Sequence, residues 1–346
     1  MIETNFSTTS LERLINATLQ SAGFCRETAE SVAGHLIEAE MMGVSSHGVV
    51  RLSSYVSQSL TGEVRPQAQP RCLFQEGALL KVDGDGGLGI PAMELALKLC
   101  QEPAHNLGVA AAGIIDCGHT GRVGAYTEAA AKAGFLAICV GGGGRHRWPN
   151  VAPHGGRHGR MSTNPYALGF PAESPDTISC DFATSSIATG KVTLAKALGT
   201  DLLPDSAIDK EGRPTNNPNV LNEGGFLLPA AGAKGSGLGV IAELIGGAML
   251  DRVREFNWLM ILVRADGFRS LSDVSRDAQA FVNEIHSTPP ASGFREVLAP
   301  GEPERRRLTR SGAEGIRLAQ VVRESVFETA RSVGVDPEAL LETQIS

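Results

Sequence analysis

The N-terminal quarter of the chain spaces its apolar residues at the period of an α-helix. A capping box that begins at Thr9 precedes four apolar residues at helical spacing, and Gly23 ends this first pattern. A second helix is predicted from about residue 28 to residue 43, and a third from about 47 to 62. Residues 1–75 are therefore expected to form a helical segment.

A proline-bearing connector at 63–72 leads into short apolar runs that alternate with helical periods, as is typical of an α/β fold. Strands are predicted at 78–86 (with a turn), 108–116, 135–140, 167–171, 177–183 and 256–266. Helices are predicted at 91–101, 122–134, 187–198, 235–250 (as a buried helix), 273–285 and 311–332. A long loop rich in glycine, arginine, histidine and proline is expected at 141–164.

Composition argues against two classes of partner. Of 346 residues, 42% are hydrophobic and 20% charged, and the formal net charge is −7 without a block of like charges. We therefore expect no nucleic-acid surface and no wide contact with an anionic membrane. The apolar run 226–250 contains Lys234 and Glu243, so it is not expected to span a membrane.

The cysteines and the N-terminal residues favour a reducing compartment, the cytoplasm. Six cysteines are scattered without a CxxC pair, which suits reduced thiols better than a disulfide framework. The N-terminus carries early acidic residues and lacks the apolar core of a signal peptide. A cytoplasmic protein is predicted.

The stretch GVSSHGVVRLSSY places three chemically useful side chains at helical spacing. His47, Arg51 and Tyr55 would lie within about a quarter-turn of one another, opposite an apolar stripe. That stripe would contain Val49, Leu52, Val56 and Leu60. The three polar residues could form the solvated face of a surface helix, or an acid/base group, an anion clamp and a phenol could face one cleft.

Two glycine-rich stretches could cradle a phosphate group. VGGGGRHRWPN follows a strand but does not open into a helix, so a Rossmann fingerprint is rejected. In AGAKGSGLGVIAELI, Lys234 precedes glycines and a serine that lead into a helix, where backbone N–H groups could face an anion. A glycine-rich packing turn explains that stretch equally well.

Other polar residues also have two interpretations. The loop histidines lie among arginines that disfavour a metal dication, so no metal site is expected, and an anion-facing or solvated loop is favoured. His119 follows a strand, where ligand contacts or caps occur. Asp181 could orient a histidine, but its spacing favours a cap of the next helix. GxSxG is absent, so serine-nucleophile chemistry has no support.

Seven stretches together carry a family resemblance. They are, in order, SSHGVVRLSSY, GHTGRVGAYTEAAAKAG, APHGGRHGRMSTNPYALGFP, DFATSSIATGKV, DKEGRPTNNP, LLPAAGAKGSGLG and VLAPGEPE. The chain resembles, over nearly its whole length, the malate/L-lactate dehydrogenase type 2 family of NAD(P)-dependent oxidoreductases. That family also contains ureidoglycolate, sulfolactate and diketogulonate enzymes and cyclic-imine reductases.

The resemblance implies an α/β (α+β) fold in which a non-Rossmann cofactor domain surrounds a mostly antiparallel sheet. Residues 76–304 would form the cofactor-binding and catalytic region. Residues 305–346 would supply helices that pack with the N-terminal segment, so that both chain ends build a helical domain. Members are typically homodimers with the active site near the subunit interface.

The resemblance also implies roles for individual residues. His47 matches a proton donor or acceptor at the substrate oxygen, His119 a second active-site histidine, and Asp181 a group that supports the histidine. Arg51 would bind the substrate carboxylate, with Ser46 and Tyr55 beside it. NAD or NADP would contact Thr163, Asn164, Pro165, Ser179, Asp181, Ala183, Ala233, Lys234, Gly301 and Glu302.

This chemistry suits a small 2-hydroxy acid and its 2-oxo acid. Histidine has an ordinary pKa near ~6.5 and can exchange a proton near neutral pH, whereas the arginine fork binds a carboxylate. Two alternatives are an imine reductase acting on a cyclic or N-alkyl 2-imino acid, and a cofactor-binding homologue that has lost catalysis.

The chain departs from the family in two places. The strand that ends in ICV is followed by GGGGRHRWPN instead of an asparagine-containing strand end, and the segment at 250–256 is shortened. The first change removes an expected cofactor contact, and the second could alter the cofactor pocket or the dimer contacts. The basic loop 145–160 could favour an anionic group, either on the substrate or as an NADP phosphate.

Overall fold

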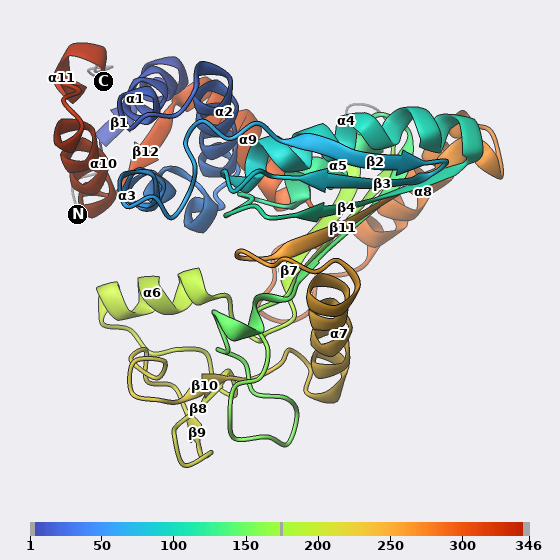
Figure 1. Ribbon diagram of the computed structural model, residues 1–346. Helices are drawn as coiled ribbons and strands as arrows, with labels where there is room; N and C mark the ends of the chain where they lie inside the picture. The colour runs from blue at the N-terminus through green and yellow to red at the C-terminus, as the bar shows by residue number, and fades with distance from the viewer. Residues whose placement is uncertain (1–3, 174–175, 342–346) are drawn as a thin grey trace.

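The strands in the middle of the chain form one seven-stranded sheet in the computed structural model, which describes residues 4–173 and 176–341 (Figure 1). Only β3 and β4 are parallel neighbours; every other neighbouring pair is antiparallel, so the expected mostly antiparallel sheet is confirmed. The strand order is β2 (Arg71–Glu76), β3 (Leu79–Asp83), β4 (Val109–Ile115), β11 (Asn257–Arg264), β5 (Phe135–Gly142), β6 (Pro165–Pro171) and β7 (Thr177–Ala183). The edge strand β2 is exposed and falls partly on the predicted connector.

Two helices cover one face of this sheet because each has an apolar stripe. In α4 (Gly89–Leu107) the buried residues recur at helical spacing, and α5 (Gly124–Lys132) packs beside it. α4 meets the alternate side chains of β4, where Ala110, Ala112 and Ile114 are buried, and α5 packs on β5 and β6. This core positions the turn between β4 and α5, which contains His119.

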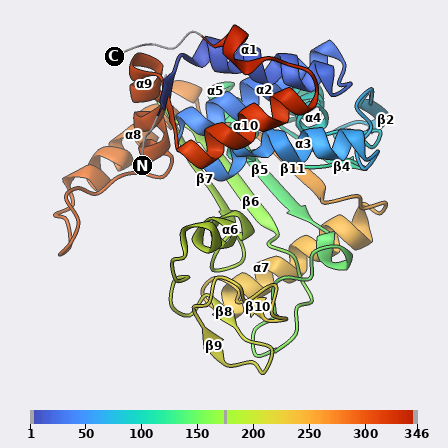
Figure 2. The same cartoon turned by 90° about the vertical axis from the view of Figure 1, so that its left-hand side faces the viewer.

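The two ends of the chain meet in a helical layer beside the sheet (Figures 1 and 2). A short antiparallel pair, β1 (Thr4–Phe6) and β12 (Ile316–Leu318), joins them. Their shared apolar core includes residues of both ends. The helices are α1 (Thr8–Ser21), α2 (Arg26–Met41), α3 (Leu52–Leu60), α10 (Gln320–Ser332) and α11 (Pro337–Leu340). The boundaries predicted near residues 75 and 304 stay a prediction.

Two predicted helix limits are wrong. The first helix is capped by Ser7, whose hydroxyl accepts the backbone N–H of Ser10 at 3.1 Å, so Thr9 lies inside the helix. The predicted helix 311–332 is interrupted, because Gly315 has a φ of +86° and the chain then forms β12. Helix α9 (Glu302–Glu314) ends at this break, and α8 (Leu271–Ser287) precedes α9 in the sequence.

A separate lobe lies below the sheet in Figure 1. It contains α6 (Thr189–Leu198), the short strands β8 (Ala207–Ile208), β9 (Pro214–Thr215) and β10 (Phe226–Leu227), and the neighbouring α7 (Ala233–Leu244). The π-helical turn Ile245–Met249 follows α7. No helix in the described part of the chain is long and apolar enough to cross a membrane.

The prediction that 235–250 is a buried helix is wrong for one of its faces. Gly235, Gly239 and Gly246 lie on the inner face: a Cβ on Gly246 would lie 2.1 Å from the carbonyl carbon of Gly142. The large side chains therefore point outward, and Leu238, Ile241 and Leu244 are exposed by 42%, 52% and 49%. This exposed apolar face is large enough to require an explanation.

Candidate active site

Two histidines from distant parts of the sequence lie stacked at the junction of the helical layer and the sheet. The ring centroids of His47 and His119 are 5.5 Å apart and their planes differ by 26°. His47 ends the 3₁₀ turn Ser45–His47, and its Nδ1 lies 3.0 Å from the hydroxyl of Ser46. His119 lies in the turn that connects β4 to α5. Both rings are half-buried, so a small ligand could still reach them.

The local backbone around His47 differs from the predicted regular helix. The turns Ser45–His47 and Val49–Arg51 are 3₁₀ helices, and the α-helix starts only at Leu52. The carboxylate of Glu40 fixes these turns by accepting the Ser45 hydroxyl at 2.6 Å and the Val49 N–H at 3.1 Å. Because a 3₁₀ helix turns further per residue, the helical-wheel argument does not hold for these positions.

The burial of Tyr55 decides between a solvated face and a residue that faces the site. The tyrosine is 1% exposed, so the interpretation of a solvated face is wrong for it. Val49, Leu52 and Val56 are buried as expected, whereas Leu60 is 64% exposed at the end of the helix and does not belong to the stripe. Tyr55 instead points toward the turn that carries His119.

Hydrogen bonds select one tautomer for neutral His119. Its Nδ1 lies 2.7 Å from the Tyr55 hydroxyl and accepts the backbone N–H of Gly121 at 3.2 Å. Because a backbone N–H can only donate, we infer that Nδ1 carries the lone pair and Nε2 the proton. The Tyr55 hydroxyl then donates to Nδ1, which leaves Nε2 for a ligand.

A guanidinium lies beside both rings. Arg51 donates from Nε to the carbonyl oxygen of Ser46 at 2.7 Å, which fixes its side chain next to His47. Burial, followed by the positive charge of Arg51, lowers the pKa of His47 to about 4 and the pKa of His119 well below its ordinary value. Both histidines are therefore neutral bases near pH 7. An anionic ligand at Arg51 would offset the repulsion that Arg51 exerts.

A buried network behind the histidines was missed in the sequence. His35 accepts the backbone N–H of Arg122 at 2.7 Å, and burial lowers the pKa of His35 to about 3. The Arg122 guanidinium binds both oxygens of Glu128, at 2.8 and 2.9 Å, and Glu128 accepts the Ser179 hydroxyl at 2.9 Å. Arg122 and Glu128 lie in the quoted stretch GHTGRVGAYTEAAAKAG, but the sequence did not indicate that they pair or that His35 joins them, because the network connects α2, α5 and β7.

The prediction that Asp181 caps the next helix is wrong: α6 begins after Ala188 without a side-chain cap, and Asp181 instead contacts the start of the earlier helix α5. Its carboxylate accepts the backbone N–H of Gly124, the first residue of α5, at 2.8 Å. Burial raises the pKa of Asp181, while the Gly124 N–H and the charge of Arg122 oppose that rise. The hydrogen bonds of Asp181 within the described residues include none to a histidine.

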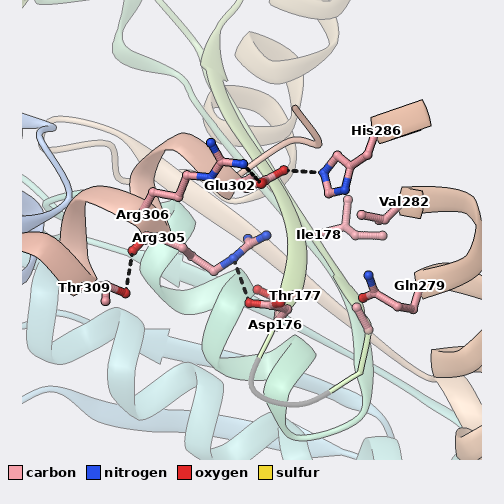
Figure 3. A pocket seen from close by; sticks show the side chains of 11 residues that line it. Asp176, Thr177, Ile178, Gln279, Val282, His286, Glu302, Arg305, Arg306 and Thr309 are labelled. Carbon is pink, nitrogen blue, oxygen red and sulfur yellow. Dashed lines mark hydrogen bonds and ion pairs between the residues drawn. The ribbon is translucent and has the colours of Figure 1, made fainter. Parts of the chain in front are cut away.

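A second feature lies at the other end of β7. A cavity of about 220 Å³ lies between the start of β7, α8 and α9, and Figure 3 shows the side chains that line it. In it, the Glu302 carboxylate lies 2.7 Å from His286 Nε2 and 2.6 Å from Arg306 Nη2, and Arg305 Nε lies 3.3 Å from Asp176. Nη1 of Arg305 is buried and has no hydrogen-bond partner in the described chain.

Gly301 allows the chain to pass close to β7 at this cavity. Its φ is +82°, and a Cβ on it would lie 2.4 Å from the Ser179 hydroxyl oxygen. Gly301 also precedes the first turn of α9, which begins at Glu302. Strand β7 therefore runs from this cavity at Thr177 to the helix start at Asp181, near the histidine turn.

The remaining predicted residues form a third group around α7. Asn164 is buried with a φ of +41°, and its Nδ2 donates to the carbonyl of Gly239 at 3.0 Å. The Thr163 carbonyl accepts the backbone N–H of Thr184 at 2.9 Å, and Pro165 pairs with Ala183 in the sheet. Ala233 and Lys234 are exposed in the first turn of α7.

The basic loop forms no compact cluster of ligands. His146, His154 and His158 are exposed, and Arg147 makes an ion pair with Glu63. Among residues 4–173 and 176–341, no group of three or more histidine, cysteine, aspartate or glutamate side chains is arranged to hold a metal ion.

The residues just described lie in a chain whose family is recognisable over most of its length. Residues 6–326 match the protein family described as malate/L-lactate dehydrogenase. The chain belongs to that family. The expected class of enzyme, an NAD(P)-dependent oxidoreductase of hydroxy acids, is confirmed at the level of the family.

Individual relatives share both sequence and fold with this chain. It is 31% identical to hydroxycarboxylate dehydrogenase B of Escherichia coli O157:H7, over 97% of this chain and 96% of that one. The solved structure of sulfolactate dehydrogenase from Methanocaldococcus jannaschii superimposes with a TM-score of 0.84 at 28% identity, covering 97% and 99% of the two chains. The solved structure of Δ1-piperideine-2-carboxylate reductase from Pseudomonas syringae pv. tomato superimposes with a TM-score of 0.84 at 28% identity, covering 94% of this chain and 99% of that one.

Proposed function

We propose that this protein interconverts a small 2-hydroxy acid, similar to malate or lactate, and its 2-oxo acid with NAD or NADP. The observation that carries the proposal is the stacked His47–His119 pair beside Arg51, half-buried where a small ligand can reach it. A bound nicotinamide would supply or accept the hydride at C2. The protein must then bind the carboxylate and move one proton at the substrate oxygen.

The side chains have complementary roles in this proposal. In the direction of oxidation, a neutral imidazole takes the hydroxyl proton as the hydride leaves C2; in reduction, the imidazolium returns that proton to the oxygen. Arg51 binds the carboxylate through two parallel N–H groups. Ser46 and Tyr55 orient the two rings, and Asp181 fixes the start of α5 behind the histidine turn.

The cavity beside β7 supports the binding of an anionic cofactor. The unpartnered Nη1 of Arg305 and the close approach of Gly301 to Ser179 suit a phosphate or ribose group. We propose that the cofactor follows β7 from this cavity toward the histidines. Its proposed contacts are Thr163, Asn164, Pro165, Ser179, Asp181, Ala183, Ala233, Lys234, Gly301 and Glu302.

We also propose a cytoplasmic homodimer that takes a small carboxylate substrate. The exposed side chains of Leu238, Ile241 and Leu244 support an interface with a second copy, since a monomer seldom exposes such a face. All six cysteines are free thiols, which suits a reducing compartment. Light scattering on a size-exclusion column should give about twice the mass of the chain, and Ile241→Glu should give the mass of one chain.

Two alternatives make different predictions. An NAD(P)H-dependent imine reductase would use the same carboxylate clamp, and the likeness to a Δ1-piperideine-2-carboxylate reductase supports it. A catalytically inactive cofactor-binding homologue would not be expected to keep His47, His119 and Arg51 together.

One assay separates all three. The absorbance of NADH and of NADPH is followed with a panel of 2-oxo acids, each with and without methylamine, for wild type and His47→Ala. Turnover without amine that His47→Ala abolishes supports the dehydrogenase. Turnover that requires amine supports the imine reductase, whereas cofactor binding without any turnover supports the inactive homologue. Full activity in His47→Ala would contradict the role of His47.

A further inference from the structure

A third buried histidine, which the proposed reaction does not use, reaches the turn between β4 and α5 from the helical layer. His35 lies on α2 and is 7% exposed, and its Nε2 accepts the backbone N–H of Arg122 at 2.7 Å. Its ring stacks on that of Tyr126 in α5, with centroids 5.6 Å apart and planes that differ by 27°. Because a backbone N–H can only donate, the neutral ring of His35 carries its proton on Nδ1 and its lone pair on Nε2. His35 is therefore a fixed hydrogen-bond acceptor inside the protein.

The hydrogen bond to His35 is one residue away from the bond that fixes His119. The N–H of Gly121 donates to His119 Nδ1 at 3.2 Å, and the next N–H along the chain, that of Arg122, donates to His35. His35 also packs closely on this turn, since a Cβ on Gly121 would lie 2.2 Å from His35 Nε2. Two consecutive N–H groups of one turn therefore bind two different histidines.

The other contacts of the turn separate the contribution of His35. The carbonyl oxygen of His119 accepts the backbone N–H of Gly89 at 2.9 Å, so the backbone of His119 is held without His35. The Tyr55 hydroxyl, 2.7 Å from His119 Nδ1, can either donate or accept, so it does not select a tautomer by itself. The Gly121 N–H makes that selection. A buried N–H without an acceptor is unfavourable, so loss of the His35 acceptor favours a rotation of the peptides at Gly121 and Arg122.

We propose that His35 is a positioning residue for the reaction: by accepting the Arg122 N–H, it aligns the Gly121 N–H that keeps the lone pair of His119 on Nδ1. The inference rests on the proposed function, because His119 is taken to act on the substrate. The selected tautomer leaves the Nε2 proton of His119 available as a hydrogen-bond donor to the substrate oxygen. Without the His35 acceptor, His119 can carry its proton on Nδ1 and present a lone pair at Nε2 instead.

Substitutions of His35 separate its hydrogen bond from its packing. His35→Gln places an amide oxygen near the position of Nε2, whereas His35→Leu removes the acceptor; both lose the ring that stacks on Tyr126, so the two variants are matched. The nitrogen NMR resonances of the His119 ring, assigned with His119→Gln, report its tautomer in the protein without substrate. Wild type and His35→Gln should carry the proton on Nε2, and His35→Leu should show both tautomers.

Steady-state kinetics with the best 2-oxo acid give the second readout. His35→Leu should lower kcat about tenfold or more, because His119 loses its fixed orientation. Its KM should stay within about twofold of wild type, because Arg51 still binds the carboxylate. His35→Gln should keep kcat within about threefold of wild type, since the acceptor is restored.

Several results would overturn the proposal. An unchanged tautomer of His119, or an unchanged kcat, in His35→Leu would do so. Equal losses in His35→Leu and His35→Gln would assign the effect to the stacked ring and not to the acceptor. If His35→Leu does not fold, His35→Asn replaces it in the same comparison, because its amide is one methylene too short to reach Arg122. If wild type turns over none of the acids, the proposed function fails by itself, and the tautomer of His119 in the variants still decides about His35.

Discussion

Two groups of histidines in this chain differ in their burial, in their contacts and in how far apart their members lie in the sequence. His47 and His119 come from distant segments, stack on each other and lie beside one arginine in a half-buried site. His146, His154 and His158 share one loop with several arginines, yet all three are exposed. The three loop histidines are close in sequence but exposed, whereas His47 and His119 are distant in sequence but in contact. Position relative to the core, and not local abundance, distinguishes a candidate catalytic histidine.

The partners of the two groups explain the difference. Tyr55 and the Gly121 N–H fix the ring of His119, and the Ser46 hydroxyl contacts that of His47. Burial and Arg51 then lower the pKa of both rings. A group with fixed orientation and a shifted pKa can be matched to a proton-transfer step, whereas a solvated loop offers neither property.

Removal of His119 should have the largest effect on activity. His119→Ala should lower kcat/KM for the best substrate by about 10²- to 10⁴-fold, because positioned acid/base groups contribute that much. His105→Ala is a matched control, since His105 is an exposed residue of α4. It should change kcat/KM less than about twofold. Steady-state absorbance assays at saturating cofactor measure both, and a small effect of His119→Ala would contradict its role.

Loss of the Arg51 charge should have the next largest effect. Arg51→Ala should lower kcat/KM by about 10- to 100-fold, mostly through KM, because the carboxylate loses a charge-assisted pair of hydrogen bonds. Since Arg51 lowers the pKa of His47 and His119, its removal should also shift the pH profile upward. Arg295→Ala, at an exposed arginine, is the control. An unchanged KM would show that the carboxylate binds elsewhere.

The periodicity of apolar residues and the turn residues predict much of the fold, but they predict the candidate site only in part. The strands of the sheet and most helices have regular patterns, so local spacing predicts them. Tyr55 was placed near His47 by a helical wheel, yet the 3₁₀ turns and the β4–α5 turn bring it to His119. His35 had no local signal, because its hydrogen bond to the Arg122 backbone is a tertiary contact.

The support behind the histidine turn can be tested through stability. Gly121 has a φ of +69°, and a Cβ on it would lie 2.2 Å from His35 Nε2. Gly121→Ala should therefore lower the free energy of unfolding by about 2–4 kcal/mol. Gly62 has a φ of +72° with nothing within 4 Å, so Gly62→Ala should cost only about 1–2 kcal/mol. Urea unfolding measures both, and equal losses would contradict a close-packed support.

Loss of the Tyr55 hydroxyl should have the smallest effect. Tyr55→Phe keeps the buried ring and removes the hydrogen bond to His119 Nδ1, so kcat should fall about three- to tenfold. Thermal stability should change little, because the ring still fills its space. An unchanged kcat together with an unchanged pH profile would show that Tyr55 does not orient His119. Tyr166→Phe, which removes a hydroxyl that donates to the Leu238 carbonyl at 3.0 Å, serves as the control.

The pH dependence of kcat/KM for hydroxy-acid oxidation tests the central claim most directly. Oxidation needs a neutral imidazole, and a pKa lowered below 6.5 keeps it neutral as the pH falls from 7. The rate should therefore stay near its plateau down to about pH 5.5 and decline only below that, with activity recovered on return to pH 7. A decline centred at or above pH 6.5 would contradict a desolvated histidine pair as the proton acceptor.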